Sequence, residues 1–285
     1  MEKYNEIKKA SILGIFANTF LAIIKLIVGL FSKSQAMVAD GLNSLGDIVT
    51  STMTLIGNRI ACKPKDNDHP YGHGKAEYIF SLMIGLVLIE FSLQIIKNAI
   101  DCYINNIHLT FSIWLVIVSI ITIVIKFVLY MYTKNIAKRN KSILLLANSQ
   151  DHRNDIFLTF GTLISIISSI FKLYYIDIIV AIFISFWIGY TAIKIIIESY
   201  RVLMDTNIDQ KIIDNIKDIV LSINGVNHID EIIAKPTGLK YLLIVKVSVP
   251  GEVSVNEGHK IAGIIREKVN ELDTVNDTVV HINPC

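Results

Sequence analysis

The chain has 285 residues, of which 52% are hydrophobic and only 18% are charged. Soluble domains contain about 25% charged residues, so this composition excludes an ordinary soluble protein and also excludes intrinsic disorder. The net charge of +2 gives no electrostatic reason to expect a nucleic acid partner. Three scattered cysteines without a CxxC pair indicate neither a disulfide framework nor a thiolate zinc site.

Apolar residues are concentrated in residues 10–200, whereas residues 201–285 have the composition of a small soluble domain. A helix needs about 20 apolar residues to cross the hydrocarbon core of a bilayer. Six stretches are long enough: Ala10–Phe31, Gln35–Cys62, Ala76–Ile100, Phe111–Tyr132, Ile143–Phe171 and Asp177–Tyr200. We therefore expect a polytopic α-helical membrane protein, with six transmembrane helices in a transport domain of residues 1–206.

Lysine and arginine are unequally divided between the two ends of these helices. Loops rich in these residues stay in the cytoplasm. With the amino terminus inside, the inner ends carry twelve of them: Lys3, Lys8, Lys9, Arg59, Lys63, Lys65, Lys75, Lys134, Lys138, Arg139, Lys141 and Arg201. The outer ends carry three: Lys33, Lys97 and Lys172. This bias predicts a multi-pass protein of the inner (cell) membrane with both termini in the cytoplasm.

Residues 207–285 show a different periodicity. Helical spacing covers Asp209–Ser222 and Val255–Leu272, and strand-like runs cover Val226–Ala234, Tyr241–Val249 and Thr278–Ile282. The order αββαβ predicts an α+β domain with helices on one face of a small sheet. Fewer than about 80 residues give a modest core, which favours oligomerisation.

Several of the apolar stretches carry acids, although a carboxylate near the bilayer centre costs about 2.5–3.5 kcal/mol. Two stretches carry them in pairs of polar side chains. Asn43 and Asp47 are four residues apart, as are Asp151 and Asp155. Residues at this spacing share one face of a helix, so two such faces could offer four oxygen-bearing side chains to one divalent cation. A lone acid such as Glu90 is more simply explained by a hydrogen bond to a neighbouring helix.

Lysines also occur inside two of the spans. For Lys25 and Lys126 we expect long side chains that extend toward a membrane interface, where the ammonium group meets water.

These motifs, in this order, resemble the cation diffusion facilitator family of metal transporters. The resemblance covers essentially the whole chain. It rests on Ala39-Asp40-Gly41 leading into Asn43-xxx-Asp47, on the loop sequence from Asp66 to Glu77 with His-Pro-Tyr-Gly-His-Gly-Lys, on Asp151-xxx-Asp155, and on a tail ending in His281-Ile282-Asn283-Pro284-Cys285.

The resemblance implies six transmembrane helices, a ferredoxin-like cytoplasmic domain of residues 207–285 for dimerisation and regulation, and a homodimer in membrane lipid. It implies efflux of divalent metal in exchange for protons, with Asn43, Asp47, Asp151 and Asp155 as the transport site. A loop metal site would fall on Asp66, His69 and His73, and a structural ion pair on Lys75 and Asp205.

Relatives that move zinc usually carry a histidine in the transport site, and this set has none. Carboxylate, carbonyl and water ligands suit manganese, whereas imidazole suits zinc. The Asn-Asp and Asp-Asp set resembles the manganese-exporting branch, so we predict Mn²⁺ as cargo, with Zn²⁺, Fe²⁺ and Co²⁺ as alternatives. No organic cofactor is expected.

Several readings stay open. The loop histidines can bind metal or simply face water. Histidines of the tail bind metal in zinc-transporting relatives, and here the corresponding candidates are His228, His259 and His281. Lys246 stands where such relatives carry another histidine, which opposes that site. A passive divalent cation channel and a membrane-tethered metal sensor are more distant alternatives. An enzyme is not expected, and without a Walker phosphate loop ATP-driven pumping has no support.

Overall fold

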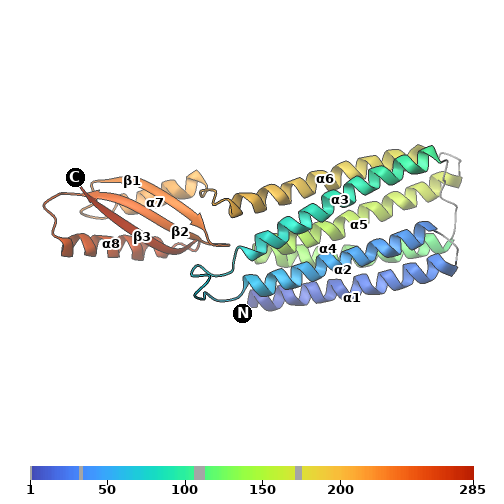
Figure 1. Ribbon diagram of the computed structural model, residues 1–285, viewed down its shortest axis with the longest axis horizontal. Coiled ribbons are helices and arrows are strands. Elements are labelled where there is room, and N and C mark those ends of the chain that lie inside the picture. Colours follow the sequence, from blue (N-terminus) through green and yellow to red (C-terminus); the bar gives the residue numbers. More distant parts are fainter. Residues whose placement is uncertain (1, 32–34, 106–112, 171–174) are drawn as a thin grey trace. The chain divides into compact units, whose positions relative to one another are not determined.

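The computed structural model describes residues 2–31, 35–105, 113–170 and 175–285 (Figure 1). Six long helices come first in the chain: α1 (Glu2–Phe31), α2 (Gln35–Ala61), α3 (Ala76–Ile104), α4 (Ile113–Arg139), α5 (Ile143–Ile170) and α6 (Tyr175–Leu203). The tail follows with α7 (Gln210–Leu221), β1 (His228–Pro236), β2 (Tyr241–Val249), α8 (Val255–Asn270) and β3 (Val275–Pro284).

The chain divides into two compact units. One contains residues 1–62 and 76–199, and the other contains residues 63–75 together with residues 200–285. The loop between α2 and α3 therefore belongs to the same unit as the tail, although it connects two helices of the other unit.

The first unit is a bundle in which α1 packs along α2, α4 packs along α5, and α2 also contacts α5. A core between α3, α5 and α6 includes Ile84, Leu144 and Ile188, which are almost completely buried. Across the same contact, the Ser92 hydroxyl donates to the carbonyl oxygen of Ser185 at 3.0 Å. These contacts hold α5 in the middle of the bundle, where its polar turn faces other helices.

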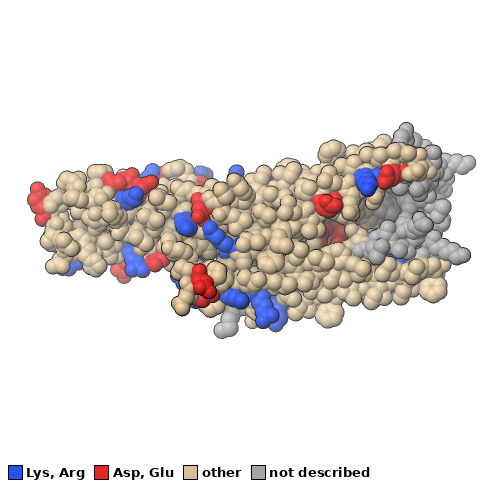
Figure 2. Space-filling view, in the orientation of Figure 1, with Lys and Arg blue, Asp and Glu red and all other residues tan. Residues whose placement is uncertain are grey.

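The outer surface of the bundle is apolar. Large side chains such as Phe16, Phe183 and Phe186 are 68–71% exposed. Few charged side chains interrupt the visible face of the six-helix unit (Figure 2). Exposed apolar surface on this scale is expected where lipid rather than water is the solvent.

Within the described residues, four segments have the length and hydropathy of a membrane span: Lys3–Val28, Ala76–Asp101, Ile113–Arg139 and Ile179–Leu203. The expected polytopic helical protein with an α+β tail is confirmed. The remaining two expected spans, α2 and α5, are long helices too. They fall outside that set because they carry the polar turns that form the candidate site.

The tail has the predicted αββαβ order. Its sheet has the strand order β1-β2-β3, with β1 antiparallel and β3 parallel to β2. The inner residues of β2 pack with Ile216 of α7 and Ile265 of α8 in one hydrophobic core. Ser254 caps α8 by accepting a hydrogen bond from the backbone N–H of Glu257, whose side chain accepts one from the backbone N–H of Ser254.

The loop 63–75 approaches the β1–β2 turn closely within their common unit. A Cβ atom added at Gly74 would lie 2.6 Å from the carbonyl oxygen of Thr237, so only glycine fits there. The turn itself has Gly238 at φ +128°, a conformation that other residues rarely adopt. This contact places Lys75 beside the start of the tail.

Candidate metal sites

Three of the predicted transport-site acids are buried in the bundle. Asp47 on α2 and Asp151 and Asp155 on α5 are each 6% exposed. Asn43 lies one turn before Asp47 on the same helix and is partly exposed. The Thr50 hydroxyl of α2 donates to Asp151 Oδ2 at 2.6 Å and so connects the two helices directly. The polar turns of α2 and α5 thus meet inside an apolar bundle.

A lysine that the sequence did not single out as part of this site lies between two of the acids. Lys126 of α4 donates to Asp47 Oδ2 at 2.6 Å and also to Asp155 Oδ2. Its side chain is completely buried. The expectation that Lys126 reaches a membrane interface is therefore wrong, because two carboxylates inside the bundle provide a nearer partner than water does.

Lys25 departs from the same expectation. Its side chain on α1 is 3% exposed, and its ammonium group donates to the Ser44 hydroxyl of α2 at 3.1 Å. Ser44 directly follows Asn43, so both intramembrane lysines lie next to the polar turn of α2.

Polar side chains continue from the acids toward α1. The Asn148 amide of α5 donates to the Ser51 hydroxyl of α2 at 3.3 Å. His152 and Asn18 are completely buried, and within the described residues neither the His152 ring nitrogens nor the Asn18 amide atoms have a hydrogen-bond partner. Sequence spacing alone did not indicate this extension, since it depends on how α1 packs against α2 and α5.

The loop residues Asp66, His69 and His73 come together at the surface. One ligand atom from each lies within 4.8 Å of the other two. Asp66 Oδ1 accepts a hydrogen bond from the His69 backbone N–H at 2.7 Å, and Asp66 Oδ2 lies 3.4 Å from His73 Nε2. The backbone N–H of His69, together with the two histidine side chains, holds the pKa of Asp66 below its ordinary value.

No second group of this kind is found in the described part of the chain, which includes the three buried acids. Their carboxylates are not all within that distance of one another, and the ammonium group of Lys126 lies between two of them. The three loop side chains are therefore already close enough to share one ion, whereas two of the buried acids, Asp47 and Asp155, bind the ammonium group of Lys126 instead.

The tail histidines are not brought together in such a group. His228 Nε2 lies 3.0 Å from Asp230, while His281 on β3 is opposite Lys246 on β2. His259 lies on α8. The ammonium group of Lys246 binds Glu231 at 2.6 Å, which keeps a positive charge next to His281.

Lys75 and Asp205 form the ion pair expected for them, with 2.5 Å between the ammonium nitrogen and Asp205 Oδ1. Lys235 of β1 approaches the same carboxylate at 3.8 Å. Asp205 therefore joins the loop 63–75 to the tail within one unit.

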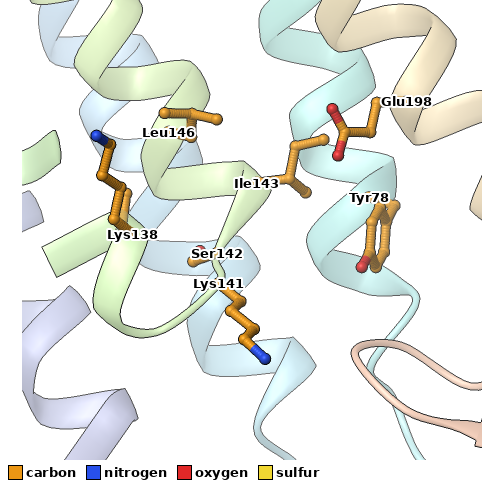
Figure 3. Close-up of a pocket in the computed structure, with 8 residues that line it drawn as sticks. Tyr78, Lys138, Lys141, Ser142, Ile143, Leu146 and Glu198 are labelled. Atoms are coloured by element: carbon orange, nitrogen blue, oxygen red, sulfur yellow. The ribbon is translucent and has the colours of Figure 1, made fainter. Parts of the chain in front are cut away.

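A pocket also lies at the connection between α4 and α5. Its walls include Lys138 and Lys141 near the connection, with Glu198 and Tyr78 on neighbouring helices (Figure 3). None of the predicted transport-site residues lines it. We therefore place the candidate transport site at the buried acids and not at this pocket.

Comparison with known proteins decides the family. Residues 11–204 match the cation efflux transmembrane domain, and residues 208–285 match the cytoplasmic domain of cation efflux proteins. The chain belongs to the cation efflux family. It is accordingly a multi-pass membrane protein of a transporter class rather than an enzyme class, and the family supports export of divalent metal.

Full-length relatives of this cation efflux protein include two from Bacillus subtilis. The manganese efflux system protein MneS is 35% identical over 287 residues, covering 100% of this chain and 99% of its own length. The manganese efflux system protein MneP is 30% identical over 285 residues, covering 97% and 96%. The magnetosome protein MamM of Paramagnetospirillum magneticum is 26% identical over 258 residues, covering 90% and 81%.

Proposed function

We propose that this protein exports Mn²⁺ from the cytoplasm in exchange for protons. The main support is that two helices bring three buried carboxylates into one polar region of a bundle that matches a cation efflux domain. Buried acids are costly in a membrane and are usually functional. A carboxylate oxygen can hold either a metal ion or a proton, which is what exchange of the two requires.

Asn43, Asp47, Asp151 and Asp155 are the proposed ligands of the transported ion. All four supply oxygen, and oxygen ligands suit Mn²⁺ better than they suit Zn²⁺, which favours imidazole and thiolate. The names of MneS and MneP describe manganese efflux, which supports the same cargo. Zn²⁺, Fe²⁺ and Co²⁺ are the alternative cargoes within the same transport class.

The proposal assigns residues 1–206 to transport and residues 207–285 to a cytoplasmic domain that forms a homodimer. The match of the tail to the cytoplasmic domain of cation efflux proteins supports this role. The lysine and arginine bias supports an inner membrane location with both termini in the cytoplasm. Asp66, His69 and His73 are proposed as a cytoplasmic metal site on the loop, while His228, His259 and His281 lack a common centre.

Metal-resolved flux into proteoliposomes tests the function. Purified full-length protein is reconstituted, and entry of Mn²⁺, Zn²⁺, Fe²⁺ and Co²⁺ is followed with and without a pH gradient. We expect Mn²⁺ to move fastest and the pH gradient to accelerate it. We expect Asn43→His to raise Zn²⁺ flux relative to Mn²⁺ flux by about tenfold, because it adds an imidazole ligand. Asn105→His, an exposed amide at the end of α3, is the matched control.

Three results would contradict the proposal. Flux that does not respond to the pH gradient would indicate a passive channel. Metal binding without flux would indicate a sensor. A wild-type preference for Zn²⁺ that Asn43→His leaves unchanged would remove the argument for manganese.

A further inference from the structure

Lys126 is the one cation that the structure places in direct contact with the proposed ligands, as far as the described residues go. It lies on the buried face of α4, in line with Thr122, Leu129 and Thr133. Desolvating an ammonium group costs several kcal/mol unless good partners surround it. Here the partners are carboxylates of two other helices, so α2, α4 and α5 meet at this nitrogen atom.

The position of the ammonium group conflicts with metal binding. Asp47 and Asp155 use one oxygen each to bind Lys126. A metal ion held by both carboxylates needs the space and the negative charge that the ammonium nitrogen now uses. Two cations so close together repel each other strongly in a medium of low dielectric constant.

Charge balance, by contrast, favours keeping Lys126 near the site when a metal ion is bound. When all three carboxylates are ionised, they and the ammonium group together carry two net negative charges, which balance the charge of one divalent cation. With the metal bound and Lys126 still nearby, the site is neutral. Without the lysine, the bound metal would leave one uncompensated carboxylate.

We propose that Lys126 is a tethered cation that holds Asp47 and Asp155 when no metal is bound and is displaced when the transported ion arrives. This inference rests on the proposed function, because it needs these acids to be the metal ligands. By competing for them, Lys126 lowers the affinity of the site and speeds release of the ion. The ammonium group stays charged throughout and only changes its partners.

Two substitutions at this position give opposite expectations. Lys126→Met removes the competitor, so Mn²⁺ binding tightens by at least about tenfold, equivalent to 1.4 kcal/mol. Flux then saturates at lower Mn²⁺ concentration with a reduced maximal rate. Lys126→Arg keeps the charge, and its planar fork holds carboxylates more firmly, so Mn²⁺ binding weakens several-fold. A merely structural lysine would not shift affinity in both directions.

Binding is measured by calorimetry with Mn²⁺ on the full-length protein, in a His69→Ala/His73→Ala background that removes the loop site. Lys134→Met is the matched control. Lys134 lies two turns further along α4 and donates to the Tyr130 hydroxyl at 2.5 Å, away from the acids. The Mn²⁺ affinity of the Lys134→Met variant is expected to equal that of the background protein.

Unchanged or weaker binding in Lys126→Met, with binding still lost in Asp155→Ala, would overturn the role of Lys126 and leave the transport site intact. If Lys126→Met does not fold, Lys126→Arg decides: binding as tight as in the background protein, or tighter, contradicts the proposal. Retention of full affinity in Asp155→Ala would overturn the transport site and this inference together.

Discussion

The acids of the bundle and those of the loop 63–75 differ in what balances their charge. Asp47 and Asp155 are buried and share the ammonium group of Lys126, whereas Asp66 is exposed and accepts hydrogen bonds from a neighbouring turn. A buried carboxylate needs a cation close by, because water cannot solvate it. An exposed carboxylate is solvated by water and by backbone N–H groups. Asp66, His69 and His73 can therefore lie close together without a neighbouring cation. The buried group suits reversible exchange of an ion, and the exposed group suits capture of an ion from the surrounding water.

Removing one buried acid is expected to have the largest effect. Asp155→Ala deletes a proposed ligand and one of the two partners of Lys126. Mn²⁺ flux into proteoliposomes should fall by more than the roughly 10–100-fold that loss of an outer-shell partner of a metal costs. Asp101→Ala, which removes an exposed acid of α3, should transport at the wild-type rate. Normal Mn²⁺ flux in Asp155→Ala would contradict the assignment of ion exchange to the buried acids.

Removing a loop histidine should give a smaller effect on transport. His73→Ala deletes one of the three side chains in the group formed by Asp66, His69 and His73. We expect one fewer tightly bound Zn²⁺ per chain by equilibrium dialysis, since imidazole is a good zinc ligand, while Mn²⁺ flux changes by less than about threefold. His259→Ala in α8 is the control and should keep the full number of bound ions. A His73→Ala protein as inactive as Asp155→Ala would show that capture and transport are not separate.

The smallest effect is expected at an acid of the tail. The Asn283 amide, with the Ser248 hydroxyl and His228, holds the pKa of Asp230 below its ordinary value. Ionised Asp230 therefore stabilises the folded tail above the unfolded-state pKa of about 3.9, and this contribution is lost as the pH falls through the lower folded-state pKa.

Asp230→Asn should accordingly weaken protection of β1 and β3 amides from hydrogen exchange at pH 7. The difference from wild type should shrink when the pH falls below about 4. Glu252→Gln, an exposed acid before α8, serves as the control. A difference that grows toward acid pH would contradict the sign of the pKa shift.

Much of the fold could be predicted because it depends on local patterns. The bounds of β2, Tyr241–Val249, agree with the prediction, since a Pro-Thr-Gly turn fixes where the strand begins. The strand β3 begins at Val275, three residues earlier than expected. Its first residues include Asn276 and Asp277, which are polar and have low strand propensity, so the sequence pattern did not indicate a strand there. Parallel pairing with β2 extends the strand over them.

The candidate site was only partly predictable. Spacing of four residues placed Asp47 and Asp151 on polar helix faces, because helical periodicity is local. The partner of Asp47 was missed, since a lysine in an apolar helix has the same sequence signature whether it reaches an interface or a buried acid. Only the packing of α4 against its neighbours distinguishes these cases. A hint existed in the regular spacing of Thr122, Lys126 and Thr133 along the buried face of α4.

The close contact between Gly74 and the Thr237 carbonyl affects how this protein can be divided into fragments. A soluble piece begun at residue 207 would omit the whole segment 63–75 and also Asp205, which both belong to the same compact unit as the tail. The hairpin turn at Thr237 and Gly238 would then lose the backbone that covers it. Thermal unfolding of such a piece would give a lower stability than the tail has in the intact chain. A crystal structure of the piece would show the β1–β2 turn without its contact to the segment 63–75.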